Sequence, residues 1–254
     1  MSPTVKLLLF SLASFVFLFI VLLLSKLFIK NEKLKDRMIL IVAIITIFIH
    51  YSIIPYDAIV GNPIEFGDNM YLPAYPCNVM MWVALVVGLL KKDSKAFSYL
   101  SEFLALGGVL CGIIGLCFNY NFLDNPDFSD YGVLKGLLSH VTLLYSALYL
   151  SVMGYIKIHT IHNLVSCTIG GGIFLICGLI TNTVKHLLGH ESINSMYLMI
   201  DKDAPLLNFY MICVSGALII LIFGTLYEVL KYPKEERWYY NIKNKNEEKQ
   251  KEGE

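Results

Sequence analysis

Seven long apolar segments run along this chain, and they constrain its fold more than any other feature of the sequence. A helix needs about 20 mostly apolar residues to cross the hydrocarbon core of a bilayer. The third segment has the shortest uninterrupted apolar run and begins with Pro73 and Pro76, which a first helical turn tolerates. We therefore predict an all-α, polytopic membrane helix bundle with seven transmembrane helices. The expected spans are Val5–Phe28, Met38–Val60, Tyr71–Leu90, Phe97–Phe118, Val133–Ile156, Leu164–Leu187 and Pro205–Tyr232.

Charged residues indicate the orientation of this bundle. The 20 Lys and Arg residues equal the 20 Asp and Glu residues in number, yet seven spans place most of the basic residues on one side. Cytoplasmic loops of membrane proteins are enriched in Lys and Arg, so we expect the N-terminus outside and the C-terminus in the cytoplasm. The expected outer side holds Lys6, Lys135, Lys185 and Lys202, together with the acidic residues Asp57, Glu65, Asp68, Asp124, Asp127 and Asp130.

Composition narrows the class of protein further. Hydrophobic residues make up 56% of the chain and charged residues only 16%, which excludes a soluble globular enzyme. The balanced charge also excludes an autonomous nucleic-acid binder. We expect a multi-pass protein of the cell membrane, with one bundle domain over residues 1–234 and a charged cytoplasmic tail over 235–254. Glycines are expected to let helices approach closely, at Gly107, Gly108, Gly112 and Gly115 in the fourth span and Gly170, Gly171, Gly172 and Gly178 in the sixth.

Cys77 stands out among the six cysteines because of its position. It follows Pro76 at the outer end of the third span, so it is expected in the first turn of that helix. Unpaired N–H groups and the positive end of the helix dipole stabilise a thiolate there. The other five cysteines lie well inside spans and are expected to behave as small apolar residues. The spacing of the six matches no metal motif.

His140 lies in the fifth span, about 10 Å below its outer end at ~1.5 Å per residue. Around it the helix carries Ser139, Thr142, Ser146 and Tyr149 at helical spacing, and these residues would line one polar face. One interpretation is a histidine that is hydrogen-bonded between helices for packing alone. The other is a polar cavity, and an ionisable residue inside a span favours that functional interpretation.

Further polar residues gather at the same expected depth near the outer face. They are Asn78, His50 and Tyr51, Asn182 and His186, and Asn194 and Tyr197. We expect these residues, with Ser139 and Thr142, to bind substrate. On the inner side, His159 and His162 are expected to be solvated, and Glu102 is expected to extend its carboxylate to the membrane surface or to pair with Lys95 or Lys91.

The segment Tyr71-Leu-Pro-Ala-Tyr-Pro-Cys77-Asn-Val-Met-Met-Trp82 resembles the Leu-Pro-x-His-x-Cys signature of YwaF-like bacterial integral membrane proteins, which are distantly similar to animal transmembrane protein 164. One departure is that Tyr75 stands where the bacterial signature has histidine. Two later blocks resemble the family in the same order: Ser139-His140 with Leu143, Ala147, Leu148 and Tyr149, and then Asn182 with Leu187-Leu188-Gly189 and Asn194-Ser195-Met196-Tyr197-Leu198.

The resemblance implies a seven-helix bundle and, in the animal branch, acyl transfer between phospholipids by a cysteine and a histidine. Carried over by position, Cys77 would be the nucleophile that accepts the acyl group and His140 its base. Asn78, Asn182 or Asn194 could donate to the developing oxyanion. This reaction requires no cofactor and no metal, and its partner is a membrane phospholipid or another fatty-acyl substrate.

Two other functions remain open from the sequence. A non-catalytic binder or transporter would hold a small solute or a lipid in the outer polar pocket. A structural bundle that scaffolds a partner is favoured less, because the polar residues cluster. The distance between the Cys77 sulfur and the His140 ring separates catalysis from binding, since a nucleophile and its base need about 2.6–3.2 Å, often more in the free enzyme.

Overall fold

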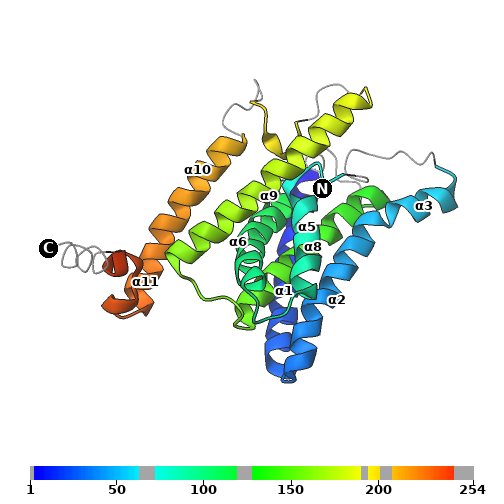
Figure 1. Cartoon of the computed structure of the whole chain (residues 1–254). Helices are drawn as coiled ribbons and strands as arrows, with labels where there is room; N and C mark the ends of the chain where they lie inside the picture. The colour runs from blue at the N-terminus through cyan, green and yellow to red at the C-terminus, as the bar shows by residue number, and fades with distance from the viewer. Residues whose placement is uncertain (1–2, 63–71, 119–127, 190–193, 201–207, 243–254) are drawn as a thin grey trace.

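The computed structural model describes residues 3–62, 72–118, 128–189, 194–200 and 208–242, and these residues form an all-helical bundle (Figure 1). The expected acidic residues Glu65, Asp68, Asp124 and Asp127 lie outside the described residues, as do Lys202 and the end of the tail. The long helices are α1 (Pro3–Phe28), α2 (Glu32–Tyr51), α6 (Lys95–Cys117), α8 (Tyr131–Val152) and α9 (Thr160–Leu187). The shorter elements are α3 (Ile53–Val60), α5 (Pro76–Leu89), η1 (Ser195–Tyr197), α10 (Phe209–Ile219), η2 (Ile220–Gly224), α11 (Thr225–Lys231) and η3 (Lys234–Glu236).

Six helical segments among the described residues are long and apolar enough to cross a membrane, when α2 with α3 and α10 through α11 are each taken as one. This confirms an all-α, multi-pass membrane protein. The third expected span is the exception, because α5 has only 14 residues and reaches about 21 Å. The hydrocarbon core is about 30 Å thick. A seventh crossing and the orientation of the termini therefore remain predictions.

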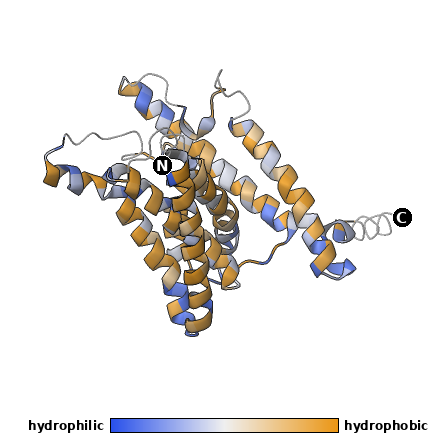
Figure 2. Cartoon of the chain, turned by 180° about the vertical axis from the view of Figure 1, so that it is seen from behind, coloured by the Kyte–Doolittle hydropathy of each residue, from blue (hydrophilic) through white to orange (hydrophobic). Residues whose placement is uncertain are grey.

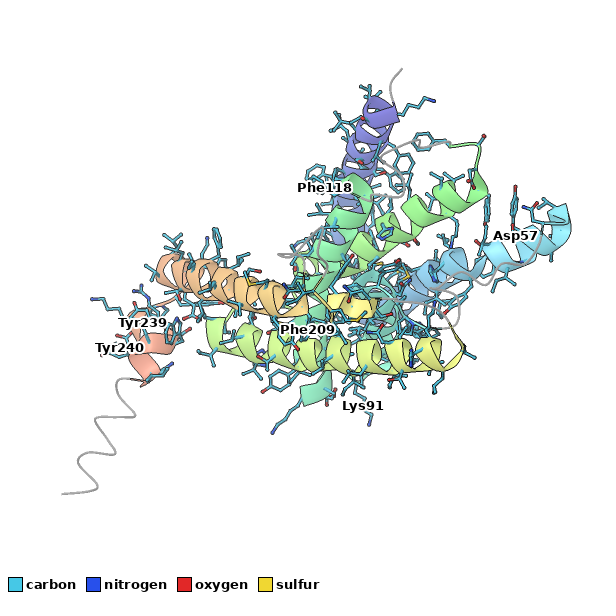
Figure 3. The ribbon with its side chains drawn as sticks, turned by 90° about the horizontal axis from the view of Figure 1, so that it is seen from above. Asp57, Lys91, Phe118, Phe209, Tyr239 and Tyr240 are labelled. Carbon is cyan, nitrogen blue, oxygen red and sulfur yellow. The ribbon has the colours of Figure 1, made fainter. Side chains whose placement is uncertain are left out.

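The second expected span is bent where α2 gives way to α3. Pro55 has no N–H to donate to the carbonyl of Tyr51, and its ring would clash with that carbonyl, so a straight helix cannot continue. Ser52 stands at the break, and its hydroxyl lies 2.6 Å from the hydroxyl of Tyr131 on α8. Viewed from above, α3 projects away from the other helices, with Asp57 on it (Figure 3).

Helices α6 and α8 form the closest pair in the core, and glycines make that approach possible. A Cβ atom on Gly108 would come within 2.9 Å of the Ala147 Cβ, and one on Gly112 within 2.7 Å of the Leu144 Cβ. Gly170 of α9 similarly faces the ring of Phe103 on α6. The predicted packing role is confirmed at these positions, whereas Gly172 has open space beside it.

Helices α9 and α10 lie on one side of this core (Figures 1 and 3). In the most apolar part of the segment from α10 to α11, only 6% of the residues are buried, against 67% in α8. The segment contains a π-helical turn, η2, at its middle. Apolar residues dominate the long helices, and hydrophilic ones gather at their ends (Figure 2).

Contacts between connections define two ends of the bundle. At what we call the basic end, Lys26 Nζ donates to the carbonyl of Val152 at 2.7 Å, and the hydroxyl of Tyr155 donates to Asp36 at 2.5 Å. At the other end, which we call the Cys77 end, the N–H of Met196 donates to the carbonyl of Ala74 at 3.0 Å. The site expected from the sequence therefore lies at the end opposite the basic connections.

Candidate functional site

Cys77 is the second residue of α5, as the proline pattern predicts. Tyr75 precedes the helix in an extended conformation, and Pro76 occupies its first position, where the missing N–H removes no helical hydrogen bond. The cysteine side chain is half-buried and packs against the apolar core. It thus lies where the first-turn N–H groups of α5 have no helical acceptor.

Asn78 joins the start of α5 to α2. Its Oδ1 accepts the N–H of Tyr75 at 3.2 Å, and its Nδ2 lies 3.4 Å from Nε2 of His50. Both side chains are buried, with 4% of Asn78 and 8% of His50 exposed. Asn78, the residue next to Cys77, is therefore within hydrogen-bonding distance of the His50 ring.

His50 is held from two further directions. Lys135 of α8 donates to the carbonyl of His50 at 3.0 Å, close to the bend that follows α2. The His50 ring meets the edge of Tyr51, and Tyr51 lies against Trp82 of α5 with ring centroids 6.3 Å apart. His50, Tyr51 and Asn78, all expected in the substrate site, are thus brought together.

The loop after α9 closes over the segment that precedes Cys77. Asn182 accepts the N–H of Ser195 at 2.9 Å, and the N–H of Met196 reaches the carbonyl of Ala74. Met196 and Tyr197 have positive φ values of 55° and 56°, which residues with a side chain seldom adopt. Two sequence blocks more than 100 residues apart therefore form one structural unit at the Cys77 end.

This strained turn holds Tyr197 at the Cys77 end of the bundle. Its phenol lies within electrostatic range of Cys77, Tyr75 and Cys111. Cys77 and Cys111 of α6 interact in the same way. The sequence did not single out Cys111, although its spacing of four residues from Gly107, which touches Met80 of α5, places it on the face of α6 that meets α5.

His140 is buried against α6. Its Nδ1 lies 2.7 Å from the carbonyl of Gly136, so Nδ1 carries the proton and Nε2 is left as the acceptor. The ring fits against Gly115, where a Cβ atom would overlap it. Its Nε2 has no hydrogen-bond partner among the described residues.

Cys77 and His140 are not joined by a hydrogen bond in the described part of the chain. Both do face α6: Cys77 lies near Cys111, and His140 lies against Gly115 one helical turn further on. One turn advances a helix by about 5.4 Å. The two groups are therefore placed along a common helix, and their direct pairing remains a prediction.

The remaining expected site residues are placed differently. Ser139 donates to the carbonyl of Gly136 at 2.8 Å, and Thr142 donates to carbonyls of its own helix. The Asn194 side chain makes two hydrogen bonds to Met199: its Nδ2 donates to the carbonyl and its Oδ1 accepts the N–H. His186 is exposed on α9. These four side chains are thus occupied locally or point outward, whereas Asn182 keeps its amide N–H groups without an acceptor among the described residues.

At the basic end, the expectations for Glu102 and His162 are wrong. Glu102 is buried and lies 2.6 Å from Nδ1 of His162, which itself stacks on the ring of Tyr99. It pairs with neither Lys95 nor Lys91, because its side chain points from α6 toward α9 instead of toward the connection. His162 is therefore a packed residue and not a freely solvated one.

Two features of the described residues concern the binding of metal ions and small molecules. No set of three His, Cys, Asp or Glu side chains in the described ranges is arranged to hold a metal ion. A cavity of about 440 Å³ opens at the basic end between α2 and α5, where its lining includes Arg37, Leu40, Lys91 and Lys92. That cavity lies away from Cys77.

Comparison with known proteins shows a family relationship. The sequence model of the TMEM164 family matches residues 1–227, which include five of the six membrane-crossing segments of the described residues and most of the sixth, Phe209–Lys231. No curated protein and no solved structure matches the chain.

Proposed function

The chain belongs to the TMEM164 family of proteins, and from that premise we propose that it is a lipid acyltransferase of the cell membrane with Cys77 as its nucleophile. The observation that carries the proposal is the convergence on Cys77 of the α5 N-terminus and the loop held by Asn182. These are the segments that resemble two of the three family blocks. A half-buried thiol at a helix N-terminus, beside apolar surface, suits an acyl ester that approaches from the bilayer.

The reaction has two balanced steps. The Cys77 sulfur attacks the carbonyl carbon of an acyl ester, and its proton passes to a neutral imidazole and then to the leaving alcohol. A hydroxyl group of a second lipid attacks the resulting thioester, gives its proton to the same imidazole, and releases the Cys77 thiol. The net change is the transfer of one acyl group between two oxygen atoms.

His140 is the proposed base. Its Nδ1–H is fixed on the Gly136 carbonyl, which leaves Nε2 with the lone pair that a base requires. Catalytic hydrogen bonds are often long in a free enzyme and shorten when substrate binds. A movement of α5 along α6 would bring the Cys77 sulfur toward the His140 ring, which stays packed against Gly115. Asn182 is the proposed oxyanion donor, because the amides of Asn78 and Asn194 are engaged.

Labelling tests this proposal. Membranes containing the protein are incubated with a phospholipid that carries an alkyne-tagged acyl chain, and the adduct is treated with hydroxylamine, which cleaves thioesters. We expect a hydroxylamine-sensitive adduct that Cys77→Ser abolishes. Cys111→Ser is the matched control, because it removes the neighbouring thiol on α6 and should leave the adduct in place.

Two results would contradict the proposal. An adduct that survives Cys77→Ser would exclude Cys77 as the acyl acceptor. Reversible phospholipid binding without any adduct, in protein whose His140 is intact, would replace the enzyme with the non-catalytic lipid binder.

A further inference from the structure

Ser98, His162 and Glu102 form a hydrogen-bonded chain at the basic end of the bundle. The carboxylate of Glu102 lies 2.6 Å from Nδ1 of His162, and the hydroxyl of Ser98 lies 3.2 Å from Nε2 of the same ring. Ser98 and Glu102 are one turn apart on α6, and His162 comes from the first turn of α9. Neither Cys77 nor His140 takes part.

The order of these contacts fixes the role of each group. An ionised carboxylate only accepts hydrogen bonds, so Nδ1 of a neutral His162 must carry the ring proton. Nε2 then accepts the proton of the Ser98 hydroxyl. This is the arrangement that activates a serine nucleophile: an acid orients the base, and the base holds the hydroxyl proton.

We propose that Ser98, His162 and Glu102 are a second catalytic site, a serine esterase triad that cleaves carboxylic esters carrying an apolar acyl chain. The site does not rest on the function proposed for Cys77. It lies at the opposite end of the bundle, where the basic connections gather.

The triad is held rigidly and remains reachable. The Glu102 side chain is 8% exposed and also accepts the hydroxyl of Ser166 at 3.1 Å. The Tyr99 ring stacks on His162 with an interplanar angle of 7°. The His162 side chain is 32% exposed, so a substrate can reach the ring edge between the imidazole and Ser98. Thus the acid is buried, the base is oriented, and Ser98 and His162 are both partly exposed.

Two local features fit an acyl ester. Ser98 belongs to the first turn of α6 and His162 to that of α9, so the positive ends of two helices flank the contact between these residues, which favours negative charge on a reacting ester oxygen. Beside His162, the apolar side chains of Ile161, Val165 and Ile169 follow one another at four-residue spacing and are each about 40% exposed. They offer an apolar surface along which an acyl chain can lie.

The reaction balances with water as the second substrate. The Ser98 oxygen bonds to the ester carbonyl carbon while its proton moves to Nε2 of His162, and the alcohol leaves with that proton. Water then attacks the acyl-serine, gives a proton to Nε2, and releases the carboxylic acid. The Ser98 hydroxyl recovers its proton from the ring.

The test uses the full-length chain with Cys77→Ala, so that the other site contributes nothing. Purified protein in detergent is treated with an alkyl fluorophosphonate probe, and the labelled residue is identified by mass spectrometry. We expect labelling at Ser98 that Ser98→Ala abolishes. His162→Gln should slow labelling by about 100-fold or more, the contribution of a general base. Ser215→Ala is the control, because this exposed serine of α10 bonds only to carbonyls of its own helix and should leave labelling unchanged.

Hydrolysis of p-nitrophenyl butyrate provides the second readout, with size-exclusion chromatography to select folded protein. Glu102→Gln keeps the shape of the acid and removes its charge, so folded Glu102→Gln protein should lose most of the ester hydrolysis. A folded parent protein that neither labels at Ser98 nor hydrolyses the ester would overturn the proposal. Labelling at Ser98 that is equally fast in folded His162→Gln protein would overturn it too.

Discussion

The imidazole of His140 on α8 packs directly against the α carbon of Gly115 on α6, in the space that a side chain at position 115 would fill. A methyl group there would overlap the ring, and overpacking a tight core costs about 1–3 kcal/mol. We expect Gly115→Ala to lower the free energy of unfolding by that amount and to displace His140. Thermal unfolding in detergent measures the change.

Gly172→Ala is the control for that experiment. Gly172 is also helical, yet nothing lies within 4 Å of the position of its Cβ atom. Alanine is a better helix former than glycine by up to about 1 kcal/mol. We expect this variant to be as stable as the parent or more so, and equal losses in the two variants would contradict the close approach at Gly115.

Asn78 caps the start of α5. Its Oδ1 accepts the N–H of Tyr75, and its Nδ2 faces His50. Asn78→Ala removes both contacts. Loss of a helix-capping acceptor costs about 0.5–2 kcal/mol, so we expect the free energy of unfolding in a denaturant titration to fall by at least that amount. Stability equal to that of the parent would show that the cap contributes nothing.

Lys135 stabilises the bend between α2 and α3 by donating to the carbonyl of His50. A hydrogen bond to a charged group contributes about 1.5–3 kcal/mol. We expect Lys135→Met to lower the free energy of unfolding by about that much. The exposed Lys157 is the control, and Lys157→Met should change stability by less than about 0.5 kcal/mol.

The environment of Tyr155 predicts that the stability of the fold decreases as the pH rises above about 10. This residue lies in the connection between α8 and α9, and burial together with the Asp36 carboxylate raises the pKa of its phenol above the ordinary value of about 10. A raised pKa in the folded state stabilises the fold below pH 10, and this contribution is lost as the pH rises further. The stability difference between the parent and Tyr155→Phe should therefore shrink above pH 10, by up to about 1.4 kcal/mol per pH unit. Thermal unfolding from pH 8 to 11 measures it, and a constant difference would refute the linkage.

Glu228 fastens the start of the tail to the bundle. Its side chain is 1% exposed and accepts the N–H groups of Thr160 and Trp238 at 2.6 and 2.9 Å. Glu228→Ala would leave both donors unpaired, so we expect residues 233–242 to detach. Limited proteolysis should then cleave this segment faster, and the emission of Trp238 should shift to the red. Unchanged cleavage in the variant would show that other contacts hold the tail.

Hydropathy and charge predicted the membrane class, the helical fold and the ends of most helices, because a bilayer imposes length and composition on each span. The bend at Ser52 follows from Pro55 and could have been predicted by the same reasoning. The short third apolar run was visible in the sequence, but the late start of α5 was not, because the residues before Pro76 share its apolar character.

The candidate site was predictable only in part. The position of Cys77 follows from the prolines beside it, and the family blocks around it do meet. The Asn78–His50 contact depends on how α2 and α5 rotate against each other, which periodicity does not determine. Glu102 and His162 were assigned to solvent or to lysines nearby in sequence, because a long-range hydrogen bond leaves no local pattern.

The glycines along α6 let α6 and α8 pack so closely that the two helices form one rigid unit. At Gly108, Gly112 and Gly115, the partner helix already occupies the space that a side chain would need, so the two backbones cannot slide without a collision. In the most apolar part of the segment from α10 to α11, by contrast, only 6% of the residues are buried. If the protein opens toward a lipid, we therefore expect the segment from α10 to α11 to move while α6 and α8 stay fixed against each other.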